Sequence, residues 1–407
     1  MRPRARSLRA RETDDKVVEA AMRVIEMRGW DECSTLACAR AAGMTSRVVT
    51  DRFPQLSDLA IAVWRTEVGR ALVDSVRQVL RSTFPDHDDP SAESVVESFN
   101  ALLRPGRNLA IALELIMAAV FDERLAAAIS LDLCDGLGPW IAREPDVESR
   151  RAAQHAYVLI AALGILIHQR GRDTSTITMS TEIERLMAVL AEPGDKLPLP
   201  GDRAPLMGLD PAGPMDAELA ELYRATVLEV AHRGYAGATL TRIVARTRTT
   251  QGLIYSRFAT KADLVAAAIR WRTSYALRHN QRWMVDLAAR VGAGLAEATV
   301  WRECLRPEHR LGRALHLEQA RAGWRVAAIS AENAAAEEAF VQSLREANPG
   351  LTQVALREHV HWGLGLGLGA ALLPTFVPGA WRLPFMVVTS PLLGAQSGQG
   401  LELLLEI

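Results

Sequence analysis

The sequence repeats itself once, and this repeat restricts the possible folds of the chain more than any other feature. A shift of 205 residues places Arg28-Gly29-Trp30 on Arg233-Gly234-Tyr235 near the start of each half and Gly164 on Gly369 near the end. Only in the middle does the register drift, by about one residue. Units of about 190 to 200 residues are too long for a solenoid repeat and have the size of a duplicated domain.

A linker separates the two units. Residues 191–215 contain six prolines and four glycines, a density that neither a helix nor a central strand tolerates. Fully extended, at about 3.3 Å per residue, the segment would reach roughly 80 Å. It can therefore carry the chain from the distal end of the first unit back across a whole domain.

Both units are predicted to be helical almost throughout. Hydrophobic residues make up 49% of the chain, alanine and leucine recur everywhere, and no alternating strand pattern persists. Apolar residues at helical spacing mark the first helix of each unit, which is expected to stop at Gly29 or Gly234. Four long helices are predicted further on, at Leu109–Val120, His155–His168, Gly312–Ile329 and His359–Leu373.

The start of each unit has the order of a helix-turn-helix. After the long first helix comes a short helix with Ser34 or Thr239 as its N-cap, then a turn, then a second short helix that begins at Thr45 or Thr250. This arrangement presents the second short helix to the major groove of DNA.

The segment Gly234–Leu264 resembles the N-terminal DNA-binding domain of the TetR family of bacterial repressors. The matching elements are Gly234-Tyr235, Thr239, Ile243-Val244, Thr250-x-Gly252-x-Ile254-Tyr255, Phe258 and Lys261-Ala262-Asp263-Leu264. The first unit fits the same frame, with Gly43 in the turn and Phe53 in place, but departs from it at Thr35, Thr50 and Leu56. The resemblance is therefore stronger in the second unit.

The resemblance implies an all-α fold with two TetR-like units, each a three-helix head followed by a helical effector and dimerisation bundle. The expected divisions are head 1 at 1–66, bundle 1 at 67–190, the linker at 191–215, head 2 at 216–271 and bundle 2 at 272–407. Because family members are homodimers with two heads, one chain here is expected to form an intramolecular pseudo-dimer. The alternative is a homodimer of chains with four heads.

The expected partner is a double-stranded DNA operator, imperfect or non-palindromic because the two recognition segments differ. Arg47 can pair with guanine and Gln251 with adenine, each worth about 1–3 kcal/mol of discrimination, and Arg52, Arg257 and Lys261 suit phosphates. The full set of candidate DNA-binding residues is Thr45, Ser46, Arg47, Val49, Thr50, Arg52, Thr239, Thr250, Gln251, Gly252, Ile254, Tyr255, Arg257 and Lys261.

Charge must act locally, since 47 basic against 48 acidic residues leave a formal net charge of -1. From Thr239 to Arg272 seven basic residues face one aspartate, whereas Ser34–Glu67 has four basic and three acidic residues. Head 1 has instead an N-terminal arm with five arginines, which suits phosphates or a minor groove. No apolar segment follows that arm, so it is not a secretory signal.

The resemblance also implies a small apolar or amphipathic effector in the bundles. Six of the nine tryptophans lie in the second unit and can line a pocket or simply pack in its core. The candidate ligand-binding residues are Gln154, His155, Trp301, His316, Glu318, Trp324, His361 and Trp362. No metal site or other cofactor is expected, because His359 and His361 point to different faces of a helix and the four cysteines form no CxxC pair.

Residues 362–381 carry no charge and are long enough to span a bilayer, but they contain five glycines and two prolines. Spacings of four residues, Gly363 with Gly367 and Gly365 with Gly369, favour the close approach of another helix instead. No membrane association is therefore expected.

An enzyme is the main rival class, and the chain has no nucleophile elbow, phosphate loop or HExxH motif. The sequence thus predicts a cytoplasmic, non-enzymatic transcriptional regulator, with a ligand-responsive repressor as its expected form. In the alternative, only head 2 binds DNA and head 1 serves in dimerisation. A remote alternative is a helical ligand-binding or enzymatic protein that does not bind DNA.

Overall fold

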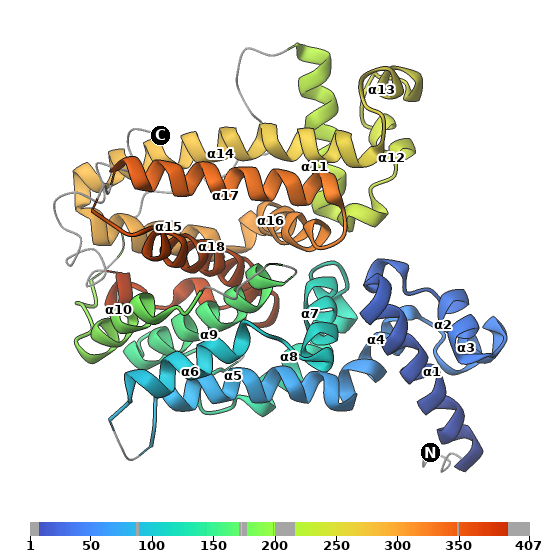
Figure 1. The fold of residues 1–407 in the computed structure, drawn as a ribbon, viewed down its shortest axis with the longest axis horizontal. Coiled ribbons are helices and arrows are strands. Elements are labelled where there is room, and N and C mark those ends of the chain that lie inside the picture. The colour runs from blue at the N-terminus through green and yellow to red at the C-terminus, as the bar shows by residue number, and fades with distance from the viewer. Residues whose placement is uncertain are drawn as a thin grey trace.

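The structure, a computed structural model, describes residues 8–86, 89–142, 144–170, 172, 177–197, 199, 216–347 and 350–389. Within these ranges the fold is all-α, as predicted, and contains no strand. Figure 1 shows two three-helix heads at one end of the molecule and a layered helical body at the other.

Each head consists of one long and two short helices. In head 1 these are α1 (Leu8–Arg28), α2 (Thr35–Ala42) and α3 (Ser46–Arg52), with a short 3-10 turn, η1 (Trp30–Glu32), after α1. In head 2 they are α11 (Ala217–Gly237), α12 (Leu240–Val244) and α13 (Gln251–Arg257).

The body is formed by the longer helices that follow each head. After head 1 come α4 (Leu56–Val63), η2 (Trp64–Val68), α5 (Gly69–Thr83), α6 (Ala92–Leu102), α7 (Arg107–Ala118), η3 (Ala119–Phe121), α8 (Glu123–Gly136), α9 (Arg150–Gln169) and α10 (Ser180–Ala191). After head 2 come α14 (Lys261–Val291), α15 (Ala293–Leu305), η4 (Pro307–His309), α16 (Arg310–Gly323), α17 (Ala327–Ala347), α18 (Gln353–Phe376) and η5 (Ala380–Arg382).

The two halves have the same order of helices. Moving α3 or α9 along the chain by 205 residues places it on α13 or on α18 to within a few residues, and α1, α2, α6, α7 and α8 find counterparts in the same order in α11, α12, α15, α16 and α17. The main difference lies in α14, which is one continuous helix where the first half has α4, η2 and α5.

A π-helical turn, η2, interrupts the first half at Trp64–Val68, and Thr66 has non-helical backbone angles there (φ -80°, ψ -160°). A π turn holds one more residue than an α turn. It therefore gives a physical reason for the one-residue drift in the middle of the repeat. The expected boundary between head 1 and bundle 1, after residue 66, falls inside this turn. The expected boundary between head 2 and bundle 2, after residue 271, falls inside the unbroken α14.

The halves meet along α9 and α18, which cross with their backbones in close contact (Figure 1). A Cβ atom on Gly164 would lie 1.8 Å from the carbonyl oxygen of Gly365, and one on Gly369 would lie 1.9 Å from that of Ile160. Since 164 and 369 correspond in the repeat, as do 160 and 365, the crossing has approximate two-fold symmetry. Gly363, by contrast, faces open space, so only one of the two expected glycine faces is used.

One hydrophobic core extends across this contact. It runs from head 1 through α7 and α9 into α18 and residues 380–388, while head 2 has a smaller core of its own that includes Leu315 of α16. The described part of the second half is therefore joined to the first half by shared apolar packing within a single chain.

Two expectations about helices have outcomes here. The single helix predicted at Gly312–Ile329 is wrong, because α16 ends at Gly323 and the chain turns at Trp324–Val326 before α17. The other three long helices are confirmed as parts of α7 with η3, of α9 and of α18.

The linker is described only at residues 191–197 and 199, where Gly194 donates a hydrogen bond to the carbonyl oxygen of Val387. The rest of the predicted linker lies outside the described residues. Among the described helices, α9 is long and apolar enough to cross a membrane, but 94% of its apolar window is buried inside the protein.

Candidate nucleic-acid interface

Head 1 is shaped by its caps and by two glycines. Gly29 ends α1 with φ +83°, and the Ser34 hydroxyl accepts a hydrogen bond from the Ala37 amide at the start of α2. Gly43 then takes the left-handed conformation (φ +68°) that ends α2 and turns the chain toward α3. These positions confirm the predicted N-cap and turn.

Head 2 has the same plan with one difference in its turn. Thr239 caps α12 and Thr250 caps α13, each accepting a hydrogen bond from the amide three residues on. Arg248 stands where head 1 has Gly43, and it does not adopt a positive φ. Because this turn lacks the glycine, α12 ends at Val244, three residues before the position that corresponds to the end of α2.

The second short helix of each head, α3 or α13, exposes a different set of side chains. On α3 these are Ser46, Arg47 and Thr50, with the Arg47 side chain 90% exposed although it lies 3.8 Å from the Asp51 carboxylate. On α13 they are Gln251, Gly252 and Tyr255, all exposed. Tyr255 is 58% exposed, an unusual position for a large aromatic side chain. Thr45, Thr239 and Thr250 are exposed at the caps.

Two of the predicted contact residues are wrong. Val49 and Ile254, which correspond in the repeat, are each 1% exposed and belong to the cores of their heads. Each helix turns by about 100° per residue, so the residue between two exposed positions of a seven-residue helix can point inward. The four apolar residues Val48, Val49, Leu253 and Ile254 could not be separated by the sequence pattern alone.

The three residues assigned to phosphates already have partners inside the protein. Arg52 binds the carbonyl oxygen of Ala10 at 2.8 Å and the Asp14 carboxylate at 2.6 Å. Arg257 lies 3.5 Å from both Asp216 and Glu218.

Lys261 donates to the carbonyl oxygen of Tyr235 at 2.8 Å and stacks over that ring. Burial lowers its pKa. All three cations thus fasten the second short helix or the following helix to the first helix of a head.

Arg248 is an exposed cation outside the predicted set of contact residues. It lies in the turn before α13 and has no ion pair among the described residues. In the sequence, the sign that this arginine is exposed was its position, which corresponds to the turn glycine Gly43 of head 1. The arginine arm of head 1 lies outside the described residues up to position 7, and Arg9 and Arg11 are exposed on the first turn of α1.

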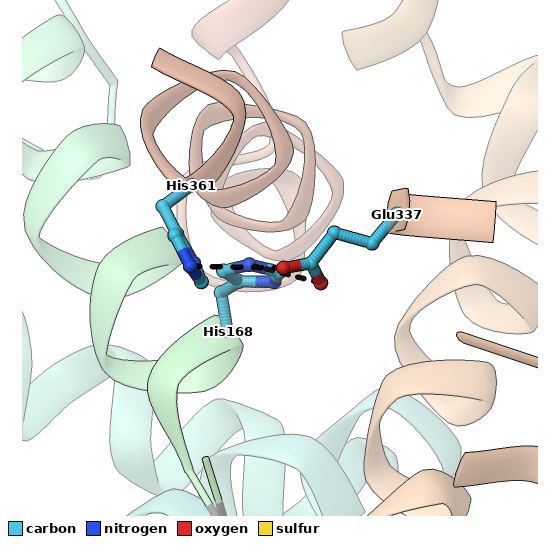
Figure 2. Close-up of side chains that lie close together, drawn as sticks. All are labelled: His168, Glu337 and His361. Carbon is cyan, nitrogen blue, oxygen red and sulfur yellow. Dashed lines mark ion pairs between the residues drawn. The ribbon is translucent and has the colours of Figure 1, made fainter. Parts of the chain in front are cut away.

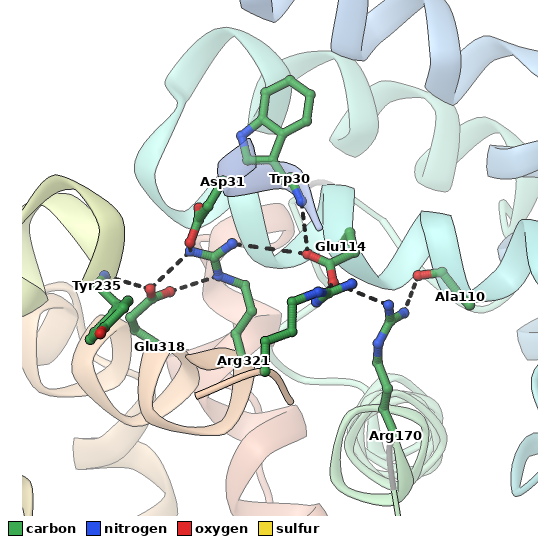
Figure 3. Close-up of polar contacts among 9 residues, drawn as sticks. Trp30, Asp31, Ala110, Glu114, Arg170, Tyr235, Glu318 and Arg321 are labelled. Atoms are coloured by element: carbon green, nitrogen blue, oxygen red, sulfur yellow. Dashed lines mark hydrogen bonds and ion pairs between the residues drawn. The ribbon is translucent and has the colours of Figure 1, made fainter. Parts of the chain in front are cut away.

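A buried ionic cluster links the two heads to the body and to each other (Figure 3). Glu114 of α7 accepts a hydrogen bond from the Trp30 amide at 3.3 Å, and Glu318 of α16 accepts one from the Tyr235 amide at 2.6 Å. Each amide follows a positive-φ glycine: Gly29 comes directly after α1, and Gly234 interrupts the helical backbone of α11 three residues before the end of that helix. Both carboxylates are 1% exposed or less, so each half uses the same buried contact to hold its head.

Arg321 joins the two carboxylates across the seam between the halves. Its guanidinium binds Glu318 at 2.8 Å and Asp31 of head 1 at 2.8 Å, and lies 3.9 Å from Glu114. Burial raises the pKa of Glu318, and the charge of Arg321 opposes this shift. Two more arginines complete the cluster at Glu114, Arg170 at 3.1 Å and Arg325.

The cluster therefore balances three carboxylates with three guanidinium groups. Only one signal in the sequence pointed to it, a glutamate inside an apolar run at matching places in the two halves.

The predicted effector residues do not share one pocket. Glu318 belongs to the ionic cluster, and Trp324 stacks with Arg170. Trp301 and Trp362 pack in the core against Tyr157 and Phe99. Gln154 donates to the carbonyl oxygen of Leu190 at 3.3 Å, while His316 and His361 lie deep in the body, where burial lowers the pKa of each to about 4.

His155 lines a cavity. This cavity of about 240 Å³ lies between the segment that follows α8, the start of α9 and the end of α18. Its other lining residues include Trp140, Leu159, Leu373 and Val377. The His155 ring packs edge-on against Phe84, its Nε2 atom is buried without a hydrogen-bond partner, and burial lowers its pKa to about 4.

Comparison with known protein families adds one finding to this geometry. Residues 222–268 match the bacterial regulatory proteins of the tetR family. The matched segment runs from within α11 to the start of α14 and includes all of α12 and α13. It supports a TetR-family, DNA-binding transcriptional regulator.

The match does not extend to head 1. No curated protein matches the chain.

Proposed function

We propose that the chain is a ligand-responsive transcriptional repressor in which two unlike heads bind one DNA operator. The tetR-family match supports DNA binding by head 2, and head 1 is assigned the same role because its helices have the same order and caps. We assign the heads to residues 1–66 and 216–271, the bundles to 67–190 and 272–407, and the linker to 191–215.

The observation that carries this proposal is the placement of the heads. Both lie at the same end of the molecule, and each has an exposed second short helix (Figure 1). Two such helices suit successive major grooves on one face of a duplex. The ionic cluster around Arg321 supports a fixed orientation, because it fastens both heads to the same seam.

The two heads would read different bases. The proposed contacts of head 1 are Ser46, Arg47 and Thr50, and those of head 2 are Gln251, Gly252 and Tyr255. Arginine with guanine, and glutamine with adenine, are the favourable pairings, so the two half-sites would differ. Thr45, Thr239, Thr250 and Arg248 are the proposed phosphate contacts.

The cavity beside His155 favours a second role, the binding of a small effector. It is mostly apolar, is lined in part by His155, and lies where α9 and α18 meet the segment that follows α8. A ligand there would press on the contact between the two halves and so change how the heads are held. Its volume suits a compact molecule rather than an extended one.

A gel-shift experiment tests DNA binding and separates the two heads. A fragment selected from genomic DNA is titrated with the wild-type chain and with Tyr255→Ala, Arg47→Ala and the control Arg70→Ala, which alters an exposed arginine on α5. Loss of a base contact worth about 1–3 kcal/mol weakens binding roughly 5- to 150-fold, so both head variants should show that loss and the control should not.

The outcomes distinguish the alternatives. Specific binding that Tyr255→Ala weakens and Arg47→Ala leaves unchanged, in both affinity and site, would leave head 1 as a dimerisation partner only. Absence of any specifically bound fragment would overturn the proposed function.

A further inference from the structure

Three side chains that no function discussed above uses meet at the seam between the halves. His168 near the end of α9, His361 of α18 and Glu337 of α17 point toward one another from three different helices (Figure 2). The two imidazoles are 6% and 5% exposed, and the carboxylate is also buried. Their sequence positions gave no sign of this meeting, and the expectation of no metal site considered His361 only together with His359.

The spacing of the three groups is close to that of metal ligands. The Nε2 atom of His361 lies 3.6 Å from one Glu337 carboxylate oxygen, and the Nε2 atom of His168 lies 3.9 Å from the other. One ligand atom from each residue lies within 4.8 Å of both others. A tetrahedral ion with bonds of about 2.0–2.2 Å separates its ligands by roughly 3.3–3.6 Å, so small side-chain rotations would close the site.

Two buried polar atoms lack hydrogen-bond partners here. One is an imidazole nitrogen that could bind a metal ion, and the other is an amide oxygen that could orient a second imidazole. His168 Nε2 has no hydrogen bond, and neither has Oε1 of the adjacent Gln169, whose amide nitrogen contacts His361 Nδ1 at 3.0 Å. Burial lowers the pKa of both imidazoles and so favours their neutral form, the form that binds metal ions.

We propose that His168, His361 and Glu337 bind one divalent transition-metal ion of the zinc type. Two imidazoles and one carboxylate are a zinc ligand set that leaves a fourth position for water. Imidazole ligands favour this class over Mg²⁺ and Ca²⁺, which prefer oxygen.

The neighbouring groups have supporting roles in this site. Exchange of the oxygen and nitrogen of the Gln169 amide lets its oxygen accept from His361 Nδ1–H, which leaves Nε2 free for the metal. Arg172 binds Glu337 and can keep one carboxylate oxygen while the other turns to the ion. Gln169 and Arg172 are therefore positioning residues.

The alternative is a purely structural cluster in which Arg172 neutralises Glu337 and the histidines only fill space. That arrangement satisfies the carboxylate, but it leaves the buried Nε2 atom of His168 without a partner, which is costly in a protein interior.

Cobalt substitution tests the proposal on the full chain. After treatment with a chelator, the protein is titrated with Co²⁺, whose visible absorption reports a low-symmetry site of four or five ligands, and then with Zn²⁺. We expect a visible band that saturates at one Co²⁺ per chain and disappears when Zn²⁺ displaces it. His361→Ala and Glu337→Gln should abolish the band.

His359→Ala is the matched control, because this histidine lies two residues away on the same helix, is partly exposed and pairs with Glu182. It should keep the band and the affinity. Gln169→Ala should weaken binding about 10- to 100-fold, as expected for a residue that orients a ligand, and should keep the spectrum.

Thermal unfolding gives a second readout that does not depend on colour. Zn²⁺ should raise the Tm of the wild-type chain and of His359→Ala, and should leave that of His361→Ala unchanged. Glu337→Gln keeps the side-chain volume, so its helical circular dichroism should match the wild type. No saturable band in the wild type, or equal binding by His361→Ala, would overturn the proposal.

Discussion

Glu114 and Glu318 show how single residues fix the position of a whole head. Each carboxylate accepts the amide that follows a left-handed glycine, and each is held in place by arginines from the seam. A buried carboxylate is costly unless its hydrogen bonds and charge are satisfied. The cluster therefore contributes more to the orientation of the heads than to the stability of the fold. Removing one of its arginines would leave a buried carboxylate without its counter-charge, which destabilises the protein.

Arg321→Ala tests this cluster at the residue scale. The change leaves Glu318 buried with only the Tyr235 amide as its partner, so the free energy of unfolding should fall by about 3–5 kcal/mol. The control is Arg70→Ala, where an exposed pair with Glu67 predicts a loss below about 1 kcal/mol. Urea unfolding followed by circular dichroism measures both, and equal small effects would contradict the assigned role.

Single residues were predictable from sequence where the reason was local. Ser34, Thr239 and Thr250 cap helices as expected, and Gly43 makes the expected turn. Val49 and Ile254 were misassigned because a seven-residue helix has too few positions to fix which side faces the core. The partners of Glu114 and His168 could not be predicted, because they come from other segments of the chain, 56 to 211 residues away from Glu114.

At the scale of helices, the α9–α18 crossing joins the two halves. It depends on two glycines in the repeat, Gly164 and Gly369, that allow backbone contact where any side chain would collide. The tetR-family match covers only head 2, so this crossing, rather than the family, explains why the halves form one body.

Substitution of Gly369 tests the crossing. The Cβ atom of Gly369→Ala would fall 1.9 Å from the Ile160 carbonyl oxygen, and separating the helices should lower the free energy of unfolding by about 1–3 kcal/mol or more. Gly363→Ala on the same helix faces open space and should be neutral or stabilising by up to about 1 kcal/mol. Thermal unfolding of the two variants compares them directly, and similar Tm values would contradict the proposed contact.

Most helices followed from apolar periodicity, and the exceptions have physical reasons. The break at Trp324 between α16 and α17 interrupts a pattern that reads as one helix, since the apolar spacing continues through the turn. The π turn in the first half changes the register of the repeat by only one residue. So small a shift does not show where in the sequence the turn lies. The glycine pairs correctly predicted a close helix contact but not which pair makes it.

For the molecule as a whole, the two halves of one chain pack as two subunits of a dimer would. The shared core and the ionic cluster already cover the seam that a second chain would need. We therefore expect a monomer in solution. Light scattering should give a mass near 44.5 kDa across a range of concentrations, and a stable mass of twice that value would favour the four-headed dimer instead.

The repeat and the two heads were predictable at this scale because they depend on order along the chain, whereas the linker stays a prediction, since most of it lies outside the described residues. The packing of the halves and the separate places of the tryptophans were not, because they depend on contacts between distant segments. The candidate effector residues lie apart for this reason, and His155 lines a cavity.

The central claim is that one chain reads two different half-sites, and a base-resolved footprint of the complex tests it most directly. DNA selected from a random pool by the wild-type chain is footprinted with wild type, Arg47→Ala and Tyr255→Ala. The account predicts two unlike protected half-sites about one helical turn, roughly 34–36 Å, apart. Arg47→Ala should weaken protection at one and Tyr255→Ala at the other. Protection of a single half-site, or two identical half-sites affected equally by both changes, would contradict it.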